Sequence, residues 1–167
     1  ALHLGVIALL FALSFVLPDY HHGLLARIMV LAVFAMGYNI LFGYVGLLSL
    51  GHAMFFSAGL YGAGLTVIHL GWNVPAAFAA GLACGALLAL VIGLLALRTT
   101  GVAFMIVTMM FAQVFALSLI YFAGWTGGDQ GLVVPQPARV LNFGTAAFDL
   151  TRPTVRYMAA LVLFAVV

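Results

Sequence analysis

Among the polar side chains within the apolar part of this chain, six are candidates for contact with a polar solute. Polar groups at membrane depth usually face the interior of a helix bundle or a water-filled cavity. Each could instead make a hydrogen bond between helices, and a threonine can bond back to its own helix. The six candidates for a substrate path are Asn39, Ser49, His52, Thr66, Thr108 and Gln113.

Catalytic and metal-binding chemistry has little support in the rest of the sequence. There is no lysine and no glutamate, so the chain lacks the lysine of an ATP-binding phosphate loop and the glutamate of an H-E-x-x-H zinc motif. Cys84 is the only cysteine, and we expect it to be a small packing residue. A membrane enzyme would need several ionisable groups at one depth, and the charge-free stretch between Arg27 and Arg98 offers only the histidines His52 and His69. We therefore predict no catalytic residue, no metal site and no cofactor in this chain.

The composition indicates a protein that crosses a membrane several times. Hydrophobic residues make up 67% of the 167 residues and charged residues only 5%, against about 25% charged in a soluble domain. The stretch between Arg27 and Arg98 contains no charged residue. One crossing takes roughly 20 helical residues, so this stretch alone has room for about three. The predicted fold class is all-α, a polytopic bundle of transmembrane helices.

Six apolar segments form one predicted transmembrane domain over residues 1–167. A signal peptide is the alternative for the first segment, but its apolar region is long and no A-x-A site follows. The histidine pair His21-His22 falls in a predicted loop before the second segment. The chain starts without methionine and ends within an apolar run, so we expect a fragment truncated at both ends. The predicted spans are about 2–17, 24–42, 53–70, 76–97, 102–122 and 154–167.

The fourth segment carries small residues at every fourth position. On a helix this spacing makes one continuous stripe, which lets a neighbouring backbone approach closely. We predict a tight helix–helix contact, within this subunit or with a partner. The third segment carries a similar cluster at Ala58, Gly59, Gly62, Ala63 and Thr66. The stripe consists of Ala77, Gly81, Gly85, Ala89 and Gly93.

The stretch FGYVGLLSLGHA, residues 42–53, interrupts the apolar pattern with Gly43, Gly46 and Gly51. It is either a simple interfacial turn or a broken helix that dips into the membrane. Non-helical backbone at membrane depth is tolerated only inside protein or beside a water-filled cavity. Transporters use broken helices because the freed helix ends present partial charges to a substrate or ion. In that case Ser49 and His52 would lie beside the freed ends.

A second glycine-rich motif follows the fifth segment. Thr126, Gly127, Gly128 and Asp129 predict a tight turn in which Asp129 could accept hydrogen bonds from nearby backbone amides. The functional alternative is a contact at the pore mouth or near a docked binding protein.

The residues of these motifs resemble the signature of the branched-chain amino acid ABC-transporter permeases of the LivM type. That family has a pattern close to G-x-N-L-L-x-G-Y-x-G-x-L-S-L-G-H-A-x-F-F-x-x-G-A-Y. A second block, LRTTGVAFMIVTMMFAQVF followed by WTGGDQGL, resembles its R-x-x-G-x-Y-F-A pattern and T-G-G-x-x-G-L loop. The first block matches at Gly37, Asn39, Gly43, Tyr44, Gly46, Leu48 to Ala53, Phe55, Phe56, Gly59 and Tyr61.

The chain departs from the family pattern at a few places. Val102-Ala103 stands where members often have an aromatic tyrosine, and Met109-Met110 where they often have small residues. The loop that couples such permeases to their ATPase should follow the sixth helix and is absent from the sequence.

The resemblance implies a multi-pass permease subunit in a bacterial inner (plasma) membrane. Such a subunit works with a second permease, two ATP-binding subunits and a periplasmic substrate-binding protein, and ATP is bound by these partners rather than by this chain. The implied substrates are branched-chain amino acids. The alternatives are a permease of the same superfamily for urea or short amides, and a passive channel or facilitator. The resemblance implies no nucleic-acid partner.

Two arguments about orientation in the membrane disagree. The resemblance puts Arg98 in the cytoplasm and the loop at Trp125 in the periplasm. Positive charge concentrates in cytoplasmic loops, and Arg139, Arg152 and Arg156 lie on the side opposite Arg98. The prediction follows the family.

Overall fold

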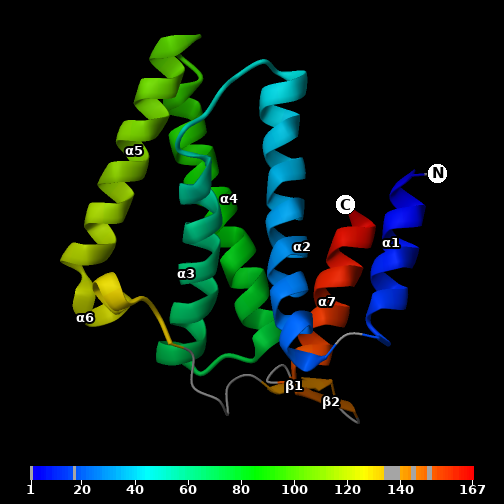
Figure 1. Cartoon of the computed structure of the whole chain (residues 1–167). Coiled ribbons are helices and arrows are strands. Elements are labelled where there is room, and N and C mark those ends of the chain that lie inside the picture. Colours follow the sequence, from blue (N-terminus) through cyan, green and yellow to red (C-terminus); the bar gives the residue numbers. More distant parts are fainter. Residues whose placement is uncertain (1, 17, 134–139, 144–145, 150–151) are drawn as a thin grey trace. The chain divides into compact units, whose positions relative to one another are not determined.

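The computed structural model describes residues 2–16, 18–133, 140–143, 146–149 and 152–167 (Figure 1). The chain divides into two compact units, Ala1–Tyr38 with Val140–Val167, and Asn39–Arg139. The first unit holds α1 (Leu2–Leu13), β1 (Val140–Phe143), β2 (Ala146–Asp149), α7 (Pro153–Val166) and all but the end of α2 (Asp19–Asn39). The second holds a π-helical segment (Ile40–Tyr44), α3 (His52–Leu70), α4 (Val74–Ala96), α5 (Val102–Tyr121), α6 (Ala123–Thr126) and a 3-10 turn (Gly128–Gln130).

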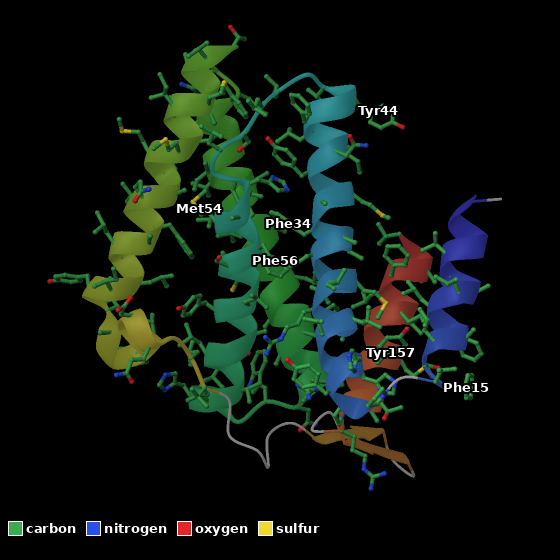
Figure 2. The ribbon with its side chains drawn as sticks, in the orientation of Figure 1. Phe15, Phe34, Tyr44, Met54, Phe56 and Tyr157 are labelled. Carbon is green, nitrogen blue, oxygen red and sulfur yellow. The ribbon has the colours of Figure 1, made fainter. Side chains whose placement is uncertain are left out.

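The predicted membrane helices are confirmed for the four central segments. Within the described ranges, four helices are long and apolar enough to cross a membrane, at Tyr20–Tyr44, His52–Leu70, Val74–Ala96 and Val102–Tyr121. Large apolar side chains stand outward along them (Figure 2), and Leu87, Leu90 and Leu94 of α4 are all exposed. Exposed apolar surface on this scale marks a contact with another apolar phase. The chain is therefore a multi-pass membrane protein.

Six spans are not confirmed. α1 has 12 residues and α7 has 14. At 1.5 Å per residue a helix of 12 residues is about 18 Å long, short of a hydrocarbon core of about 30 Å. α1 lies within the first predicted span, and α7 begins one residue before the last one. The apolar pattern therefore located both helices and overestimated the length of the first.

Two helices begin earlier in the sequence than predicted, because a proline near the start of each sets the boundary before the apolar segment begins. α2 begins at Asp19 directly after Pro18, so His21 and His22 lie in its first turns rather than in a loop. α4 begins at Val74 with Pro75 in its first turn, where the missing N–H of proline is no loss. α3 ends at Leu70, as predicted, and the following Gly71 has a φ of 63°, the left-handed conformation favoured after a helix.

The predicted loop between the fifth and sixth segments contains a short antiparallel hairpin, the one departure from helical structure among the regular elements of the described residues. β1 pairs with β2 in a register that places Val140 opposite Asp149 and Phe143 opposite Ala146. Each strand has four residues. So short a run of alternating residues cannot be told from a loop by its pattern.

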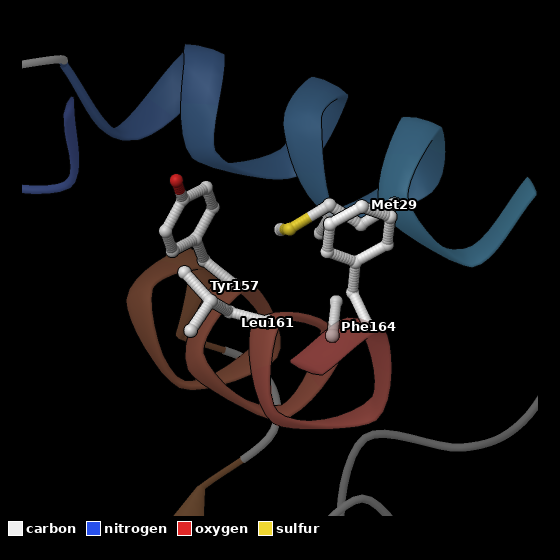
Figure 3. Packing of buried hydrophobic residues seen from close by; sticks show 6 residues of the cluster. Met29, Tyr157, Leu161 and Phe164 are labelled. Atoms are coloured by element: carbon white, nitrogen blue, oxygen red, sulfur yellow. The ribbon is translucent and has the colours of Figure 1, made fainter. Parts of the chain in front are cut away.

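The first unit has a small core between α2 and α7. Met29 of α2 meets Phe164 of α7, and Tyr157 and Leu161 lie beside them (Figure 3). Tyr157 is fully buried, and its hydroxyl donates to the Leu10 carbonyl oxygen in the last turn of α1. The same carbonyl oxygen also accepts from the Ser14 amide at 3.3 Å, so the Tyr157 bond adds a link between α7 and α1.

Candidate functional site

The glycine motif forms a broken helix rather than a tight turn. α2 passes into the π-helical segment, which closes wider turns than an α-helix and often occurs at functional sites. Residues 45–51 are then non-helical until α3 starts at His52. Gly46 has a φ of +73°, a conformation that glycine adopts without steric strain. The amide of Leu47 donates to the Leu41 carbonyl oxygen at 3.2 Å, which folds the segment back beneath the helix end.

The last part of the non-helical segment, at Gly51, lies inside the ends of the neighbouring helices. Gly51 packs directly on the backbone of Thr108 in α5, with no room for a side chain between them. Thr108 comes six residues after Val102, the first residue of α5, which is about 9 Å along the helix. Figure 1 likewise shows α3 starting below the upper ends of α4 and α5. The segment therefore re-enters the helix bundle, as the broken-helix alternative predicted.

The re-entrant segment borders a cavity of about 210 Å³. Three polar residues line it: Ser49 from the segment, His52 from the first turn of α3, and Thr108 from α5. The rest of the wall is apolar and includes Phe55, Ala89, Ile92, Ala96 and Phe104. This combination of an apolar wall with a few polar groups is typical of small-molecule sites.

The polar residues of the cavity differ in their bonding. Thr108 is buried, and its hydroxyl lies 2.9 Å from the Phe104 carbonyl oxygen on its own helix. Ser49 is 4% exposed, and its Oγ has no hydrogen-bond partner among the residues that the structure describes. The His52 ring meets the Phe55 ring edge to face at 5.9 Å. Ser49 is thus the polar side chain with unused hydrogen-bonding capacity at this site.

The other three candidates for a substrate path lie away from the cavity. Thr66 Oγ1 is 2.8 Å from the Ala63 carbonyl oxygen of its own helix, which is the alternative expected for a threonine. Asn39 folds back over Gly43, where an added Cβ would come 2.8 Å from the asparagine Oδ1. Gln113 is exposed on α5. The structure therefore places three of the six candidates, Ser49, His52 and Thr108, at one cavity.

The small-residue stripe of α4 packs against α3 within this chain. A Cβ on Gly81 would lie 2.6 Å from the Gly59 carbonyl oxygen, and one on Gly85 would lie 3.3 Å from the Phe55 carbonyl oxygen. At these positions the two backbones approach each other closely, as the predicted helix–helix contact requires. A Cβ on Gly93 would meet nothing within 4 Å, and Gly93 lines the cavity instead, with Ala89. Ala77, at the start of the stripe, is buried.

The loop motif forms the predicted tight turn, but Thr126 holds it rather than Asp129. The Thr126 hydroxyl donates to the Leu119 carbonyl oxygen at 2.6 Å and accepts from the amide of Gly128 at 3.2 Å. Gly127 and Gly128 have positive φ values of 76° and 54°. Asp129 is exposed. This turn follows the last residue of α5, whereas the cavity lies near its first turns, so the two motifs mark opposite ends of that helix (Figure 1).

Sequence reasoning missed the apolar wall of the cavity. Phe104 and Ile92 are two of many apolar residues in their helices, and nothing in their type sets them apart. The one available signal is spacing, because Phe104 precedes Thr108 by four residues and shares its helix face.

One of three comparisons with known proteins gives a match. A family model described as branched-chain amino acid transport system / permease component matches residues 21–167. The matched region contains the re-entrant segment, the cavity and the α3–α4 contact. Comparisons with curated proteins and with solved structures give no match.

Proposed function

Because the chain belongs to the family of permease components of branched-chain amino acid transport systems, we propose that it forms the translocation path of an ATP-driven importer for these amino acids. The observation that supports this most directly is the re-entrant segment, which brings Ser49 and His52 to a cavity inside the helix bundle. Irregular backbone at membrane depth is otherwise disfavoured, because unpaired backbone groups are costly in lipid.

The residues of this chain suit a transport subunit whose energy comes from ATP bound to other subunits. Without lysine it has no phosphate loop of its own, so ATP is bound by partner subunits. The task of this subunit is to adopt two conformations whose relative stability those partners bias. We propose as partners a second permease subunit, two ATP-binding subunits and a periplasmic substrate-binding protein, assembled in a bacterial inner membrane.

Transport by the assembled complex tests this function. The complete transporter, reconstituted in proteoliposomes with its binding protein, is expected to accumulate leucine only when ATP is supplied to the ATP-binding subunits. Leucine flux that continues unchanged without ATP would instead identify a passive facilitator. Accumulation of urea or acetamide in place of leucine would assign the permease to the other substrate class.

The orientation of the subunit gives a separate prediction. We expect the α4–α5 connection to face the cytoplasm and the α6 turn to face the periplasm. In a Cys84→Ser background, a membrane-impermeant maleimide added to intact cells should label Asp129→Cys and leave Thr99→Cys unlabelled. Both should react after the membrane is permeabilised. The reverse pattern would support the arrangement suggested by positive charge in cytoplasmic loops.

A further inference from the structure

The start of α3 is a positive helix end inside the protein. α3 has 19 residues, and its N-cap Gly51 makes no side-chain cap hydrogen bond. The aligned peptide dipoles give this end of a helix about half a positive charge. The Met54 amide donates to the Gly51 carbonyl oxygen at 3.0 Å, and Gly51 is fixed there by its contact with Thr108. This end of α3 therefore favours a negatively charged group beside it.

Ser49 provides the second, independent indication of a ligand. It precedes the helix by three residues, lines the same cavity, and is 4% exposed with its Oγ unpartnered within the described ranges. Buried hydroxyl groups are nearly always hydrogen-bonded, and an unsatisfied one destabilises the fold. A hydroxyl beside a helix N-terminus is a donor to the same kind of group that the helix end attracts.

We propose that this site binds the carboxylate of the transported amino acid, which the positive end of the α3 dipole attracts and to which the Ser49 hydroxyl donates. Among the residues that the structure describes, no carboxylate side chain lines the cavity to repel an anion. The aliphatic part of the substrate then lies along the wall formed by Phe55, Ile92 and Phe104. The cavity, about 210 Å³, is below the range of about 300–1,000 Å³ for drug-sized ligands and suits a small solute.

The absence of a basic side chain from this cavity fits transport. No arginine of the described ranges lines it and the chain has no lysine, so the carboxylate is held by the helix dipole and one hydroxyl rather than by an ion pair. A site on a conduction path must bind strongly enough for entry and weakly enough for release. The same donors discriminate against urea and short amides, which carry no negative charge.

The test compares leucine with leucinamide, which lacks the carboxylate. This inference rests on the proposed function, so ATP-driven leucine uptake by the wild-type complex is measured first, and its absence would overturn both. In the purified complex without binding protein, labelled leucine should be displaced at least tenfold less well by leucinamide than by leucine. Ser49→Ala should weaken leucine binding about tenfold, the scale of a hydrogen bond to a charged group, and leave leucinamide competition unchanged.

Two further variants separate a binding effect from a folding effect. Ser49→Thr keeps the hydroxyl and should retain leucine binding within a few-fold. Ser118→Ala removes a serine on the exposed side of α5 whose hydroxyl donates to the Val114 carbonyl oxygen, and it should bind leucine as the wild type does. If the wild type transports leucine, three results would each overturn the proposal: equal competition by leucinamide, unchanged leucine binding in Ser49→Ala, or no leucine binding to the permease.

Discussion

Replacing Gly51 with alanine is expected to reduce ATP-driven leucine uptake at least about tenfold. The added Cβ would collide with the carbonyl oxygen of Thr108 and lie 2.8 Å from its carbonyl carbon. Both atoms belong to the backbone of α5, so no side-chain rotation can relieve the clash. The re-entrant segment must move away from α5, which displaces Ser49 and His52 from the cavity. Overpacking of this kind destabilises the packed arrangement by about 1–3 kcal/mol. The predicted loss of transport is measured as ATP-driven leucine uptake by the reconstituted transporter.

Gly124→Ala is the matched control for this prediction. Gly124 lies in α6 of the same compact unit, and a Cβ there would meet nothing within 4 Å. We expect its uptake to equal that of the wild type. Normal uptake by Gly51→Ala would show that the segment does not rest on α5 as described, and would remove the main support for a re-entrant path.

Gly81→Ala is expected to loosen the contact between α3 and α4. The new methyl group would lie 2.6 Å from the Gly59 carbonyl oxygen and 2.9 Å from the Ala63 Cβ. The helices must separate, and backbone contact is what holds helices together where lipid provides no hydrophobic driving force. We expect a loss of about 1–3 kcal/mol. At about 2–4 °C per kcal/mol for a chain of this size, the melting temperature of the purified complex in detergent should fall by several degrees.

Gly93→Ala provides the comparison within the same helix. Its added methyl group would meet nothing within 4 Å, and replacing a glycine inside a helix by alanine favours the helix by about 1 kcal/mol. The melting temperature of this variant should stay constant or rise. If both variants melted alike, small residues in α4 would matter for helix propensity alone, and the close approach at Gly81 would have no energetic role.

The four membrane helices could be predicted from the sequence because a long apolar run in lipid must satisfy its backbone hydrogen bonds internally, as a helix does. The sequence also located the α4 stripe, since a four-residue repeat of Gly and Ala fixes a helix face without knowledge of its partner. Sequence spacing left the form of the glycine motif open. The deciding fact is the depth at which Gly51 meets Thr108, a long-range contact between two helices that neither local pattern encodes.

The candidate site could be predicted only in part for the same reason. Ser49, His52 and Thr108 were found because polar residues are rare in apolar segments. Asn39, Thr66 and Gln113 met the same criterion, yet each has a local or exposed environment in the structure. Polarity identifies candidates, and only the packing of α3, α4 and α5 separates a residue that lines the cavity from one that bonds to its own helix.

Because α3 begins only at His52, the row of small residues on α4 packs against α3 along one part and borders the cavity along the other. Gly81 and Gly85 face α3, whereas Gly93 extends past the point where α3 begins and faces open space. A continuous helix through residues 45–51 would fill that space with its own side chains. At Gly81 and Gly85 the two helix backbones are in close contact, so sliding of α3 along α4 is resisted. Under the proposed function, we expect opening and closing of the path to involve the irregular stretch and α5 together, because Gly51 packs on the backbone of Thr108.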